Sequence, residues 1–340
     1  LGTAFKLPAQ AAPPNSEELA KAVATPGLQR AMALFRLDLR TEAIREWNWT
    51  LRGMADRQLI AAAELAKRNE IWDRAINTAD RTVAEHDFSL RYLAPYHRPL
   101  TEQARANQIE ENWVLGLVRQ ESRFIASAKS SAGAAGLMQL MPTTARWVAN
   151  KMGMKDFSWA RVTTPEVNAA LGNFYLKTVL NELDGHPVLA SAAYNAGPGR
   201  ARRWQDAKPL EGAIYAESIP FDETRDYVKK VLSNTANYAA LLTGQPQSLK
   251  ERLGRVGILL LDVDVRGGDE RFDLGPTVIE CPRTLLQLRH EFARDVGDAG
   301  CEAAGGDGSQ GLRLETLLDG LGGGAGVGDR PPGGCGVPEP

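Results

Sequence analysis

The chain has 340 residues, of which 43% are hydrophobic, and its formal net charge is −2. This length provides for one large or two ordinary domains with a real core, and no apolar run of about 18 residues exists that could span a membrane. Residues 1–256 hold 33 Lys and Arg against 27 Asp and Glu, whereas residues 257–340 hold 7 Arg against 15 acids. The mildly basic body suits a neutral or anionic polymer, but its charge is far too weak to indicate nucleic acid binding.

The N-terminal segment, residues 1–27, is polar and rich in Pro and Ala, which predicts an extended, exposed approach segment. It begins with Leu1 and shows no charged-then-apolar leader. We therefore expect a signal peptide, if there is one, to have been removed or to lie outside this sequence.

Residues 28–95 have the pattern of helical hairpins and a linker. The stretches ALFRLDL, TEAIREWNWTLRG, RQLIAAAELAKRN and EIWDRAINTADRT carry Ala and large apolar residues at helical spacing, with Gly53 and Asn69 at expected helix ends. Such alternation is typical of solenoid repeats of roughly 34 residues, of which this segment has room for barely two hairpins. It fits the end of an array or a plain helical cap on the next domain, and YLAPYHRPL (residues 92–100) is predicted to be the linker.

The stretch LVRQESRF, residues 117–124, places a glutamate on an apolar helical face. Val114, Leu117, Val118 and Ile125 follow helical spacing, and Glu121 completes their series. Burial disfavours the charged form of a carboxyl group and raises its pKa, which keeps a general acid protonated near neutral pH. For a lone residue, a structural glutamate in a buried ion pair is the better explanation, so a catalytic assignment needs support from neighbouring motifs.

A glycine-containing loop comes next, KSSAGAAGLMQLMP, residues 129–142. Gly133 and Gly136 permit a backbone path that can fold closely against the Glu121 helix and a substrate. Ser130 and Gln139 are the polar groups of this loop. Pro142 is predicted to open the next helix, and Pro165, between Thr164 and Glu166, to open another.

Two later stretches complete the set. In SAAYNAGPGRARRW, a helix of small residues ends with Tyr194 and Asn195 beside a tight turn. ESIPFDETRDYV supplies Glu217 and then a helix entry whose acids suit the positive N-terminal dipole.

Residues 257–340 differ in composition from the rest. They hold 19 of the 33 glycines and all three cysteines but no Lys, Asn, Met, Trp or Tyr, so we expect a low-complexity, disordered tail. Two explanations of this composition stay open: a flexible native tail, and a shifted reading frame through G/C-rich DNA. The loss of five residue types favours the shifted frame.

Taken in order, RQESRF with GAAGLMQLMPTTA, then NAALGNFYL, AYNAGPGR and ESIPFDETRDYV resemble the soluble lytic murein transglycosylases, bacterial peptidoglycan-cleaving enzymes related to goose-type lysozyme. Four motifs in the right order over residues 108–245 make this resemblance specific. Residues 28–95 resemble the end of the superhelical ring that precedes the catalytic domain in long members, and the tail matches nothing in the family. The resemblance implies an all-α protein with a partial α-superhelical region and a lysozyme-like catalytic domain at residues 96–246.

The resemblance also implies roles for the residues of the first two motifs. Glu121 is expected to be the single catalytic acid and base. Ser130 is expected to lie near it and contact the N-acetyl group of a sugar. Gln139 and Met141 are expected to line the cleft, Met141 as an adaptable apolar wall.

Further roles fall on the later motifs. Tyr194 is expected to hydrogen-bond near the reacting sugar or to the acid itself, and Asn195 to shape the same wall. Glu217 is a candidate for binding a sugar. Glu223 and Arg225 are interpreted as structural, the first as a helix-start acid and the second as an ion-pair partner.

The implied reaction cleaves the bond between N-acetylmuramic acid and N-acetylglucosamine, and it consumes no water. Glu121 protonates the bond, the N-acetyl group of the substrate supports the cationic sugar, and Glu121 then takes the C6 hydroxyl proton as a 1,6-anhydro ring closes. Ordinary glycosidases need two carboxylates roughly 5–10 Å apart, whereas one carboxylate here stands in a motif with a clear site role. No cofactor or metal is expected, and the histidines show no ligand spacing: His86, His97, His186 and His290.

Two other classes of protein stay open. One is a lysozyme-type hydrolase, in which Asp184, Asp156 or Glu217 would serve as the base for water. The other is a non-catalytic wall-binding scaffold, against which the intact Glu121 argues. The resemblance further predicts peptidoglycan glycan strands as the partner, a monomer, and a location in the periplasm of a Gram-negative bacterium.

Overall fold

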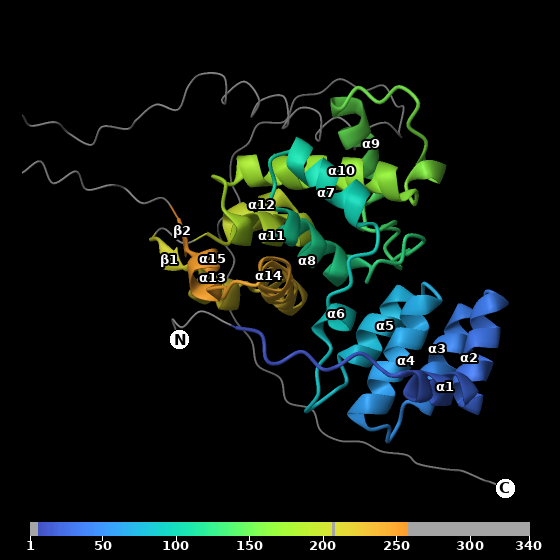
Figure 1. The fold of residues 1–340 in the computed structure, drawn as a ribbon. Helices are drawn as coiled ribbons and strands as arrows, with labels where there is room; N and C mark the ends of the chain where they lie inside the picture. Colours follow the sequence, from blue (N-terminus) through green and yellow to red (C-terminus); the bar gives the residue numbers. More distant parts are fainter. Residues whose placement is uncertain (1–5, 206–207, 258–340) are drawn as a thin grey trace, which may run out of the picture. The chain divides into compact units, whose positions relative to one another are not determined.

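The computed structural model describes residues 6–205 and 208–257, which are almost entirely helical (Figure 1). These residues form fifteen α-helices, a 3-10 turn and one two-stranded sheet, so the predicted all-α fold is confirmed. None of the helices in the described ranges is long and apolar enough to cross a membrane. The predicted tail, apart from Gly257, lies outside the described residues.

The first six helices form the helical-hairpin region, residues 16–91. Helix α2 packs on α3, α4 packs on α5, and α1 packs on α4. Buried alanines of α4, Ala61, Ala62 and Ala63, let its neighbours approach closely, and Asn69 caps its C-terminus as predicted. The helices are α1 (Ser16–Ala24), α2 (Pro26–Arg36), α3 (Arg40–Thr50), α4 (Asp56–Arg68), α5 (Trp72–Ala79) and α6 (Phe88–Arg91).

Residues 16–24 correct the prediction of an extended segment up to residue 27. The Asn15 side chain accepts a hydrogen bond from the Glu18 amide, and the Glu18 carboxylate accepts one from the Asn15 amide. This reciprocal cap starts α1 despite the Pro- and Ala-rich composition. Glu18 also pairs with Arg57 of α4 at 2.6 Å, which joins α1 to α4.

The predicted linker, residues 92–100, is shorter than expected. Helix α7 (His97–Ala106) begins inside it, after Tyr96 in the left-handed region at φ 58°. Pro99 occupies the first turn of α7, where an amide has no helical partner to lose.

The remaining helices often begin with a proline, as Pro142 and Pro165 predict. They are α8 (Glu111–Glu121), α9 (Pro142–Lys151), α10 (Pro165–Glu182), α11 (Pro187–Ala196), α12 (Pro198–Arg203), α13 (Gly212–Ser218), α14 (Asp222–Thr243) and α15 (Leu249–Leu253). The 3-10 turn is Trp159–Arg161. Strand β1 (Leu210–Glu211) pairs antiparallel with β2 (Arg255–Val256), Leu210 opposite Val256.

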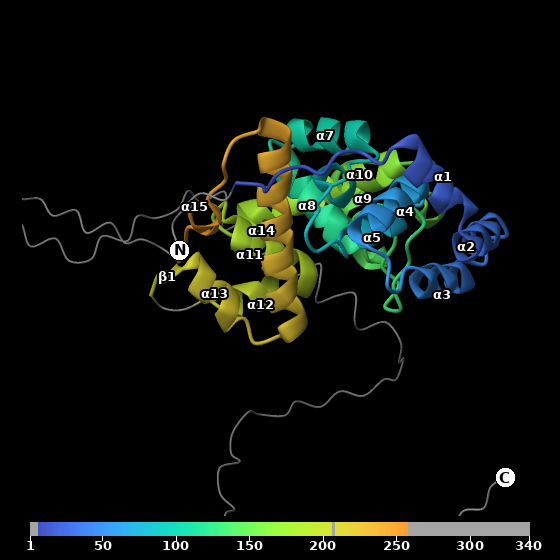
Figure 2. The same ribbon diagram turned by 60° about the horizontal axis from the view of Figure 1, so that its bottom comes forward.

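Helices α8 and α14 form the centre of the C-terminal half. Helix α14 packs along α8 and α11 (Figure 2). Its contact with α8 is close at Gly116, where a Cβ atom would lie 2.7 Å from the Thr235 Oγ1 atom. One continuous core extends from Trp47 in the hairpins to Leu117 and Tyr238, so α8 is fixed from both sides.

Candidate active site

Helix α8 carries Glu121 as its last residue. Val114, Leu117 and Val118 are fully buried, which confirms the apolar face predicted for this helix. The helix was expected to continue to Ile125, but it ends at Glu121 because Arg123 and Phe124 have φ angles of 48° and 63°. Glu121 therefore lies at a helix end, where its carboxyl group is half-buried.

The turn after Glu121 is a strained backbone held from several sides. Left-handed residues other than glycine cost about 1–3 kcal/mol each and persist where the surroundings determine them. Here the Ser122 Oγ donates to the Leu137 carbonyl at 2.8 Å, and the Phe124 side chain is fully buried. Such strain is typical of functional sites, because it fixes a side chain where a relaxed helix would not place it.

Burial of the Glu121 carboxyl group raises its pKa from 4.5 to about 7. A hydrogen bond works against this shift, because the Tyr227 hydroxyl donates to Glu121 Oε1 at 2.6 Å and stabilises the ionised form. The negative charge of Glu223 raises the pKa further. A carboxyl group with this pKa can both donate and accept a proton near neutral pH.

Tyr227 is the partner of the acid, and sequence reasoning missed it. It lies inside ESIPFDETRDYV, four residues after Glu223 and so on the same face of α14, which is the signal that could have found it. Burial, followed by the charge of Glu121, raises the pKa of Tyr227 well above its usual range, so its hydroxyl remains a donor.

Tyr194 lies close to the acid without bonding to it. Its hydroxyl donates to the Met138 carbonyl at 2.8 Å, and its ring centroid is 5.3 Å from that of Tyr175. Burial raises the pKa of Tyr194, and the charge of Glu121 is the next cause, so the two groups share one environment. Tyr194 was expected to hydrogen-bond either near the reacting sugar or to Glu121 itself. In this structure its hydroxyl makes no bond to Glu121.

The loop of residues 129–142 takes its shape from α10. Gly136 has a φ of 86°, and a Cβ atom there would lie 2.1 Å from the Asn168 Nδ2 atom. Asn168 is fully buried, accepts from the Met138 amide at 2.7 Å and donates to the Ala135 and Val162 carbonyls. The close backbone path that Gly136 predicts therefore leaves room for the Asn168 side chain. Sequence reasoning did not single out Asn168.

Three predicted residues belong to this loop. Ser130 is exposed, and its Oγ accepts from the Ala134 amide at 3.0 Å. The Gln139 amide group donates to the Ala128 and Gly136 carbonyls, which holds the loop together. Met141 precedes α9 and is 39% exposed, and its expected place in the cleft stays a prediction.

The other predicted residues lie around the start of α14. The Asn195 Oδ1 accepts from the Thr224 hydroxyl at 2.7 Å, which joins the end of α11 to α14. Glu217 is exposed and pairs with Lys229 at 3.1 Å. Arg225 donates to the Ile219 carbonyl at 3.1 Å and pairs with Asp222, which agrees with its structural interpretation.

These positions separate the predicted residues into two groups. Tyr194 shares the environment of Glu121, together with Glu223, which was interpreted as structural only. Within the described ranges, no hydrogen bond or ion pair joins Glu121 to any of the remaining predicted residues: Ser130, Gln139, Met141, Asn195, Glu217. The three alternative bases are all exposed: Asp156, Asp184 and Glu217.

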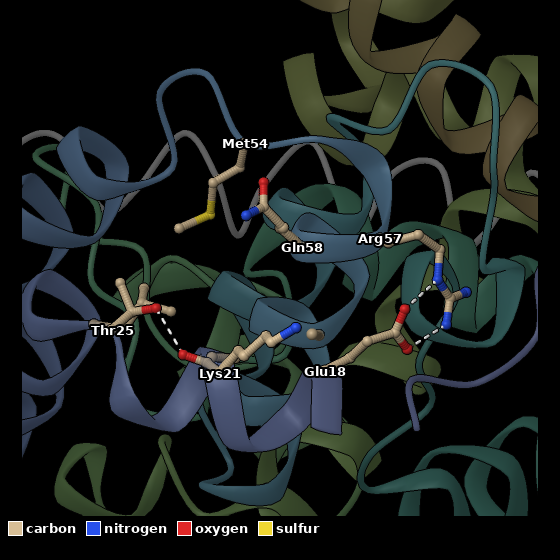
Figure 3. Close-up of a pocket in the computed structure, with 9 residues that line it drawn as sticks. Glu18, Lys21, Thr25, Met54, Arg57 and Gln58 are labelled. Atoms are coloured by element: carbon tan, nitrogen blue, oxygen red, sulfur yellow. Dashed lines mark hydrogen bonds and ion pairs between the residues drawn. The ribbon is translucent and has the colours of Figure 1, made fainter. Parts of the chain in front are cut away.

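A separate cavity of about 200 Å³ lies in the helical-hairpin region (Figure 3). Several of its polar groups have partners, since Glu18 pairs with Arg57 and the Thr25 hydroxyl donates to the Lys21 carbonyl. None of the predicted site residues lines it. Across the part of the chain that the structure describes, no cluster of three or more His, Cys, Asp or Glu is arranged to hold a metal ion.

Sequence profiles of known families match three parts of the chain. The Transglycosylase SLT domain matches residues 98–214, which include Glu121 and Tyr194. The soluble lytic murein transglycosylase L domain matches residues 21–84, and the soluble lytic transglycosylase helical domain matches residues 218–247.

Similar proteins carry related names. The soluble lytic murein transglycosylase of Salmonella typhimurium is 32% identical over 66% of this chain and 35% of its own length. An inactive glutamate-to-glutamine mutant of the lytic transglycosylase Slt from Pseudomonas aeruginosa has a TM-score of 0.63 and 36% identity, over 72% of this chain and 39% of that one. The 70 kDa soluble lytic transglycosylase of Escherichia coli has a TM-score of 0.60 and 28% identity, over 72% and 40%. The chain thus spans well under half the length of these relatives.

Proposed function

The chain belongs to the lytic transglycosylase family, and we propose that it cleaves the β-1,4 bond between N-acetylmuramic acid and N-acetylglucosamine in peptidoglycan without water. The products would carry 1,6-anhydro-N-acetylmuramic acid ends. The observation that carries this proposal is the environment of Glu121, a half-buried acid whose pKa is raised to about 7 and whose hydrogen-bond partner is a neutral tyrosine.

Glu121 acts twice in the proposed reaction. In its protonated form it gives a proton to the bridging oxygen, so the bond from that oxygen to C1 of N-acetylmuramic acid breaks. The N-acetyl group of the substrate supports the positive charge at C1. The C6 hydroxyl then bonds to C1 and returns a proton to Glu121, which restores the acid for the next cycle.

A pKa near 7 suits both steps. A carboxyl group at its ordinary value would be almost fully ionised at neutral pH and would rarely be ready to donate. The Tyr227 hydroxyl stabilises the carboxylate that exists between the two steps, since it donates to Glu121 Oε1. The inactivity of the glutamate-to-glutamine mutant of the Pseudomonas relative supports dependence on a glutamate in this family.

The proposed substrate-binding residues come from the sequence motifs that follow Glu121 in the chain. We assign Ser130 to the N-acetyl group and Met141 to an apolar cleft wall, because the first presents a hydroxyl and the second an exposed thioether. The wall continues through Tyr194 and Asn195. Gln139 acts by holding the loop, and Glu217, exposed beside Lys229, is assigned to a more distant sugar.

The setting proposed for the protein follows from its substrate. Residues 96–246 would be the catalytic domain, and residues 28–95 would belong to a longer superhelix. The partner would be the glycan strands of peptidoglycan in the periplasm of a Gram-negative bacterium, on which the protein acts as a monomer without a cofactor.

The mass of the released muropeptides tests the reaction. Peptidoglycan digested with the protein is expected to yield products about 18 Da lighter than hydrolysis products, the mass of the water that a hydrolase adds. Mass spectrometry of the digest measures this directly. Products of full hydrolytic mass would replace this proposal with a lysozyme-type hydrolase, and no released products would leave only a wall-binding protein.

A further inference from the structure

An acid of the helical-hairpin region contacts both flanks of Glu121. Asp80 directly follows α5, and its two carboxylate oxygens each accept from Arg119 Nη2 at 2.9 Å. Asp80 Oδ2 also accepts from Arg123 Nη1 at 3.2 Å. Arg119 and Arg123 stand two residues before and two residues after Glu121, so one carboxylate holds the chain on both sides of the acid.

Arg119 is a junction between three parts of the fold. Its side chain is buried, 8% exposed, although the residue lies off the apolar stripe of α8. Its Nε donates to the Arg91 carbonyl at 3.0 Å, and its Nη1 donates to the Asn234 Oδ1 at 3.0 Å. Because Nη2 contacts Asp80, each nitrogen of this guanidinium has a partner on a different segment.

The contact with Asn234 links the two helices that form the acid pair. Asn234 lies seven residues after Tyr227 on α14, which is two helical turns along the same face. Its Nδ2 also donates to the Gly116 carbonyl of α8 at 3.3 Å. The Arg119 contacts therefore fix the register between α8 and α14, and this register sets the 2.6 Å bond from Tyr227 to Glu121.

Arg123 connects Asp80 to the strained turn. It has a φ of 48° and is followed by Phe124 at 63°, so the backbone immediately after Glu121 is in a conformation that its own residues disfavour. Strained segments of this kind persist when their surroundings hold them. The ion pair with Asp80 holds the side chain of the first strained residue.

We propose that Asp80 is a positioning residue for Glu121, supplied by the helical-hairpin region, and this inference rests on the proposed function. Asp80 touches neither the acid nor the substrate. It acts through Arg119 and Arg123, which hold the helix end, the turn and the Tyr227 contact in one arrangement. The helical-hairpin region thereby forms part of the catalytic unit as well as extending the fold.

Four variants separate positioning from simple stability. Asp80→Asn keeps the size of the side chain and removes its charge, and Asp80→Glu keeps the charge. Arg123→Ala breaks only the partly exposed arm, so it threatens folding least. Asp73→Asn is the control, since Asp73 is also an acid that two arginines contact, Arg40 and Arg74, but all three lie inside the helical-hairpin region. Asp73 is more deeply buried than Asp80, with 5% of its side chain exposed against 34%, so this control is the more demanding one for stability.

The measurements are the rate of muropeptide release at saturating and at limiting peptidoglycan, and the melting temperature. Asp80→Asn and Arg123→Ala are each expected to lower the saturating rate about 10-fold, because small displacements of a catalytic group are costly. The half-saturating peptidoglycan concentration should change by less than about twofold, since the substrate contacts remain. Asp73→Asn should lower the melting temperature and leave the saturating rate of the folded protein unchanged, and Asp80→Glu should recover most of the rate.

The Glu121 pKa gives a second readout that needs no activity. It can be measured by carbon NMR of the carboxyl group, with the Glu121→Gln form of each variant as the spectral reference. A loosened turn admits water and lowers the pKa from about 7 toward 4.5. If Arg123 acted only through its positive charge, its removal would raise the Glu121 pKa. Arg123→Ala therefore lowers the pKa if Arg123 holds the turn and raises it if Arg123 acts by charge alone.

Two results would overturn the inference. One is an Asp80→Asn protein with a lower melting temperature but an unchanged saturating rate and Glu121 pKa, which would make the ion pair purely structural. The other is an Arg123→Ala protein whose Glu121 pKa rises. If the wild-type protein released no anhydro products, the proposed function would fail, and the titrations would still decide the positioning claim.

Discussion

In the helical-hairpin region, Asp73 is 3% exposed and contacts two arginines, Arg40 and Arg74. At the end of α8, Glu121 accepts a hydrogen bond from a neutral tyrosine, and the neighbouring charge that shifts its pKa is that of an acid, Glu223. A buried carboxylate without a cationic partner costs stability and shifts its pKa upward. The first arrangement preserves the fold, and the second keeps a proton available for chemistry.

The largest expected effect comes from removing the unpaired acid. Glu121→Gln keeps the size and the hydrogen bonding of the side chain but cannot transfer a proton. We expect a loss of at least about 10²–10⁴-fold in muropeptide release, the contribution of general acid–base catalysis, with binding to peptidoglycan retained. Glu111→Gln, at the other end of α8, is the control and should release muropeptides normally. Near-normal rates for Glu121→Gln would show that another group carries the reaction.

Asp73→Asn is the converse experiment. Leaving two arginines without their carboxylate in a buried site should lower the free energy of unfolding by about 3 kcal/mol. Thermal or denaturant unfolding measures this, and the rate per folded molecule should stay at the wild-type value. An Asp73→Asn variant with full stability would mean that the paired acid contributes little to the fold. The proposed difference in role between Asp73 and Glu121 would then fail for Asp73.

The Glu121 side of this contrast was accessible from the sequence, and the Asp73 side was not. The apolar stripe of α8 identified Glu121 as a helical acid on an apolar face, and the prolines at 142 and 165 located two helix starts. These signals are local, because helical periodicity and proline geometry act over a few residues. The all-α fold was implied by the resemblance to the lytic transglycosylases, and the helical periodicity of residues 28–95 agreed with it.

Most of the functional contacts that the sequence did not predict join distant segments. Tyr227 is 106 positions from Glu121, and Arg119 reaches Asp80 across 39 positions, so no local pattern reports either pair. The early end of α8 has the same origin, since Phe124 and the bond from Ser122 to the Leu137 carbonyl hold a turn that propensity disfavours. The helix at residues 16–24 was the exception, because its cap from Asn15 to Glu18 stands in the sequence and was outweighed by composition.

A third prediction concerns the stability cost of the unpaired acid. The folded-state pKa of Glu121 is raised, so between pH 4.5 and about 7 the native protein retains a proton that the unfolded chain releases. Stability from this group therefore falls as pH rises through that window. Glu121→Gln has no carboxyl group to ionise. Above pH 7 its free energy of unfolding should therefore exceed that of the wild type, by no more than about 3 kcal/mol.

Unfolding curves of both proteins at pH 4, 6 and 8 measure this difference. At pH 4 the two proteins should be nearly equal, because the glutamate is protonated in both states. A difference that does not depend on pH would mean that Glu121 is not titrating in this window, contrary to a raised pKa.

A fourth prediction addresses the tyrosine partner. The Tyr227 hydroxyl stabilises the ionised acid, so Tyr227→Phe should raise the Glu121 pKa further and move the alkaline limb of the activity profile to higher pH. A shift of about one pH unit corresponds to one hydrogen bond. Tyr238→Phe is the control on the same helix, since its hydroxyl donates to the Leu93 carbonyl. A shift to lower pH in Tyr227→Phe would reverse the role given to this hydroxyl.

The smallest expected effect is that of Glu223, whose charge raises the Glu121 pKa from the first turn of α14. Because Glu223 is exposed, solvent weakens its influence, and Glu223→Gln should move the alkaline limb to lower pH by only about 0.2–0.5 units at low salt. The shift should vanish near 1 M salt, where the screening length falls to about 3 Å. Glu166→Gln removes an exposed acid from the first turn of α10, so it reproduces the loss of a helix-start charge and should leave the limb in place. A Glu223 shift that persists at high salt would show that this residue holds Glu121 through structure, and the acid would then owe its position to α14 as well as to the turn after α8.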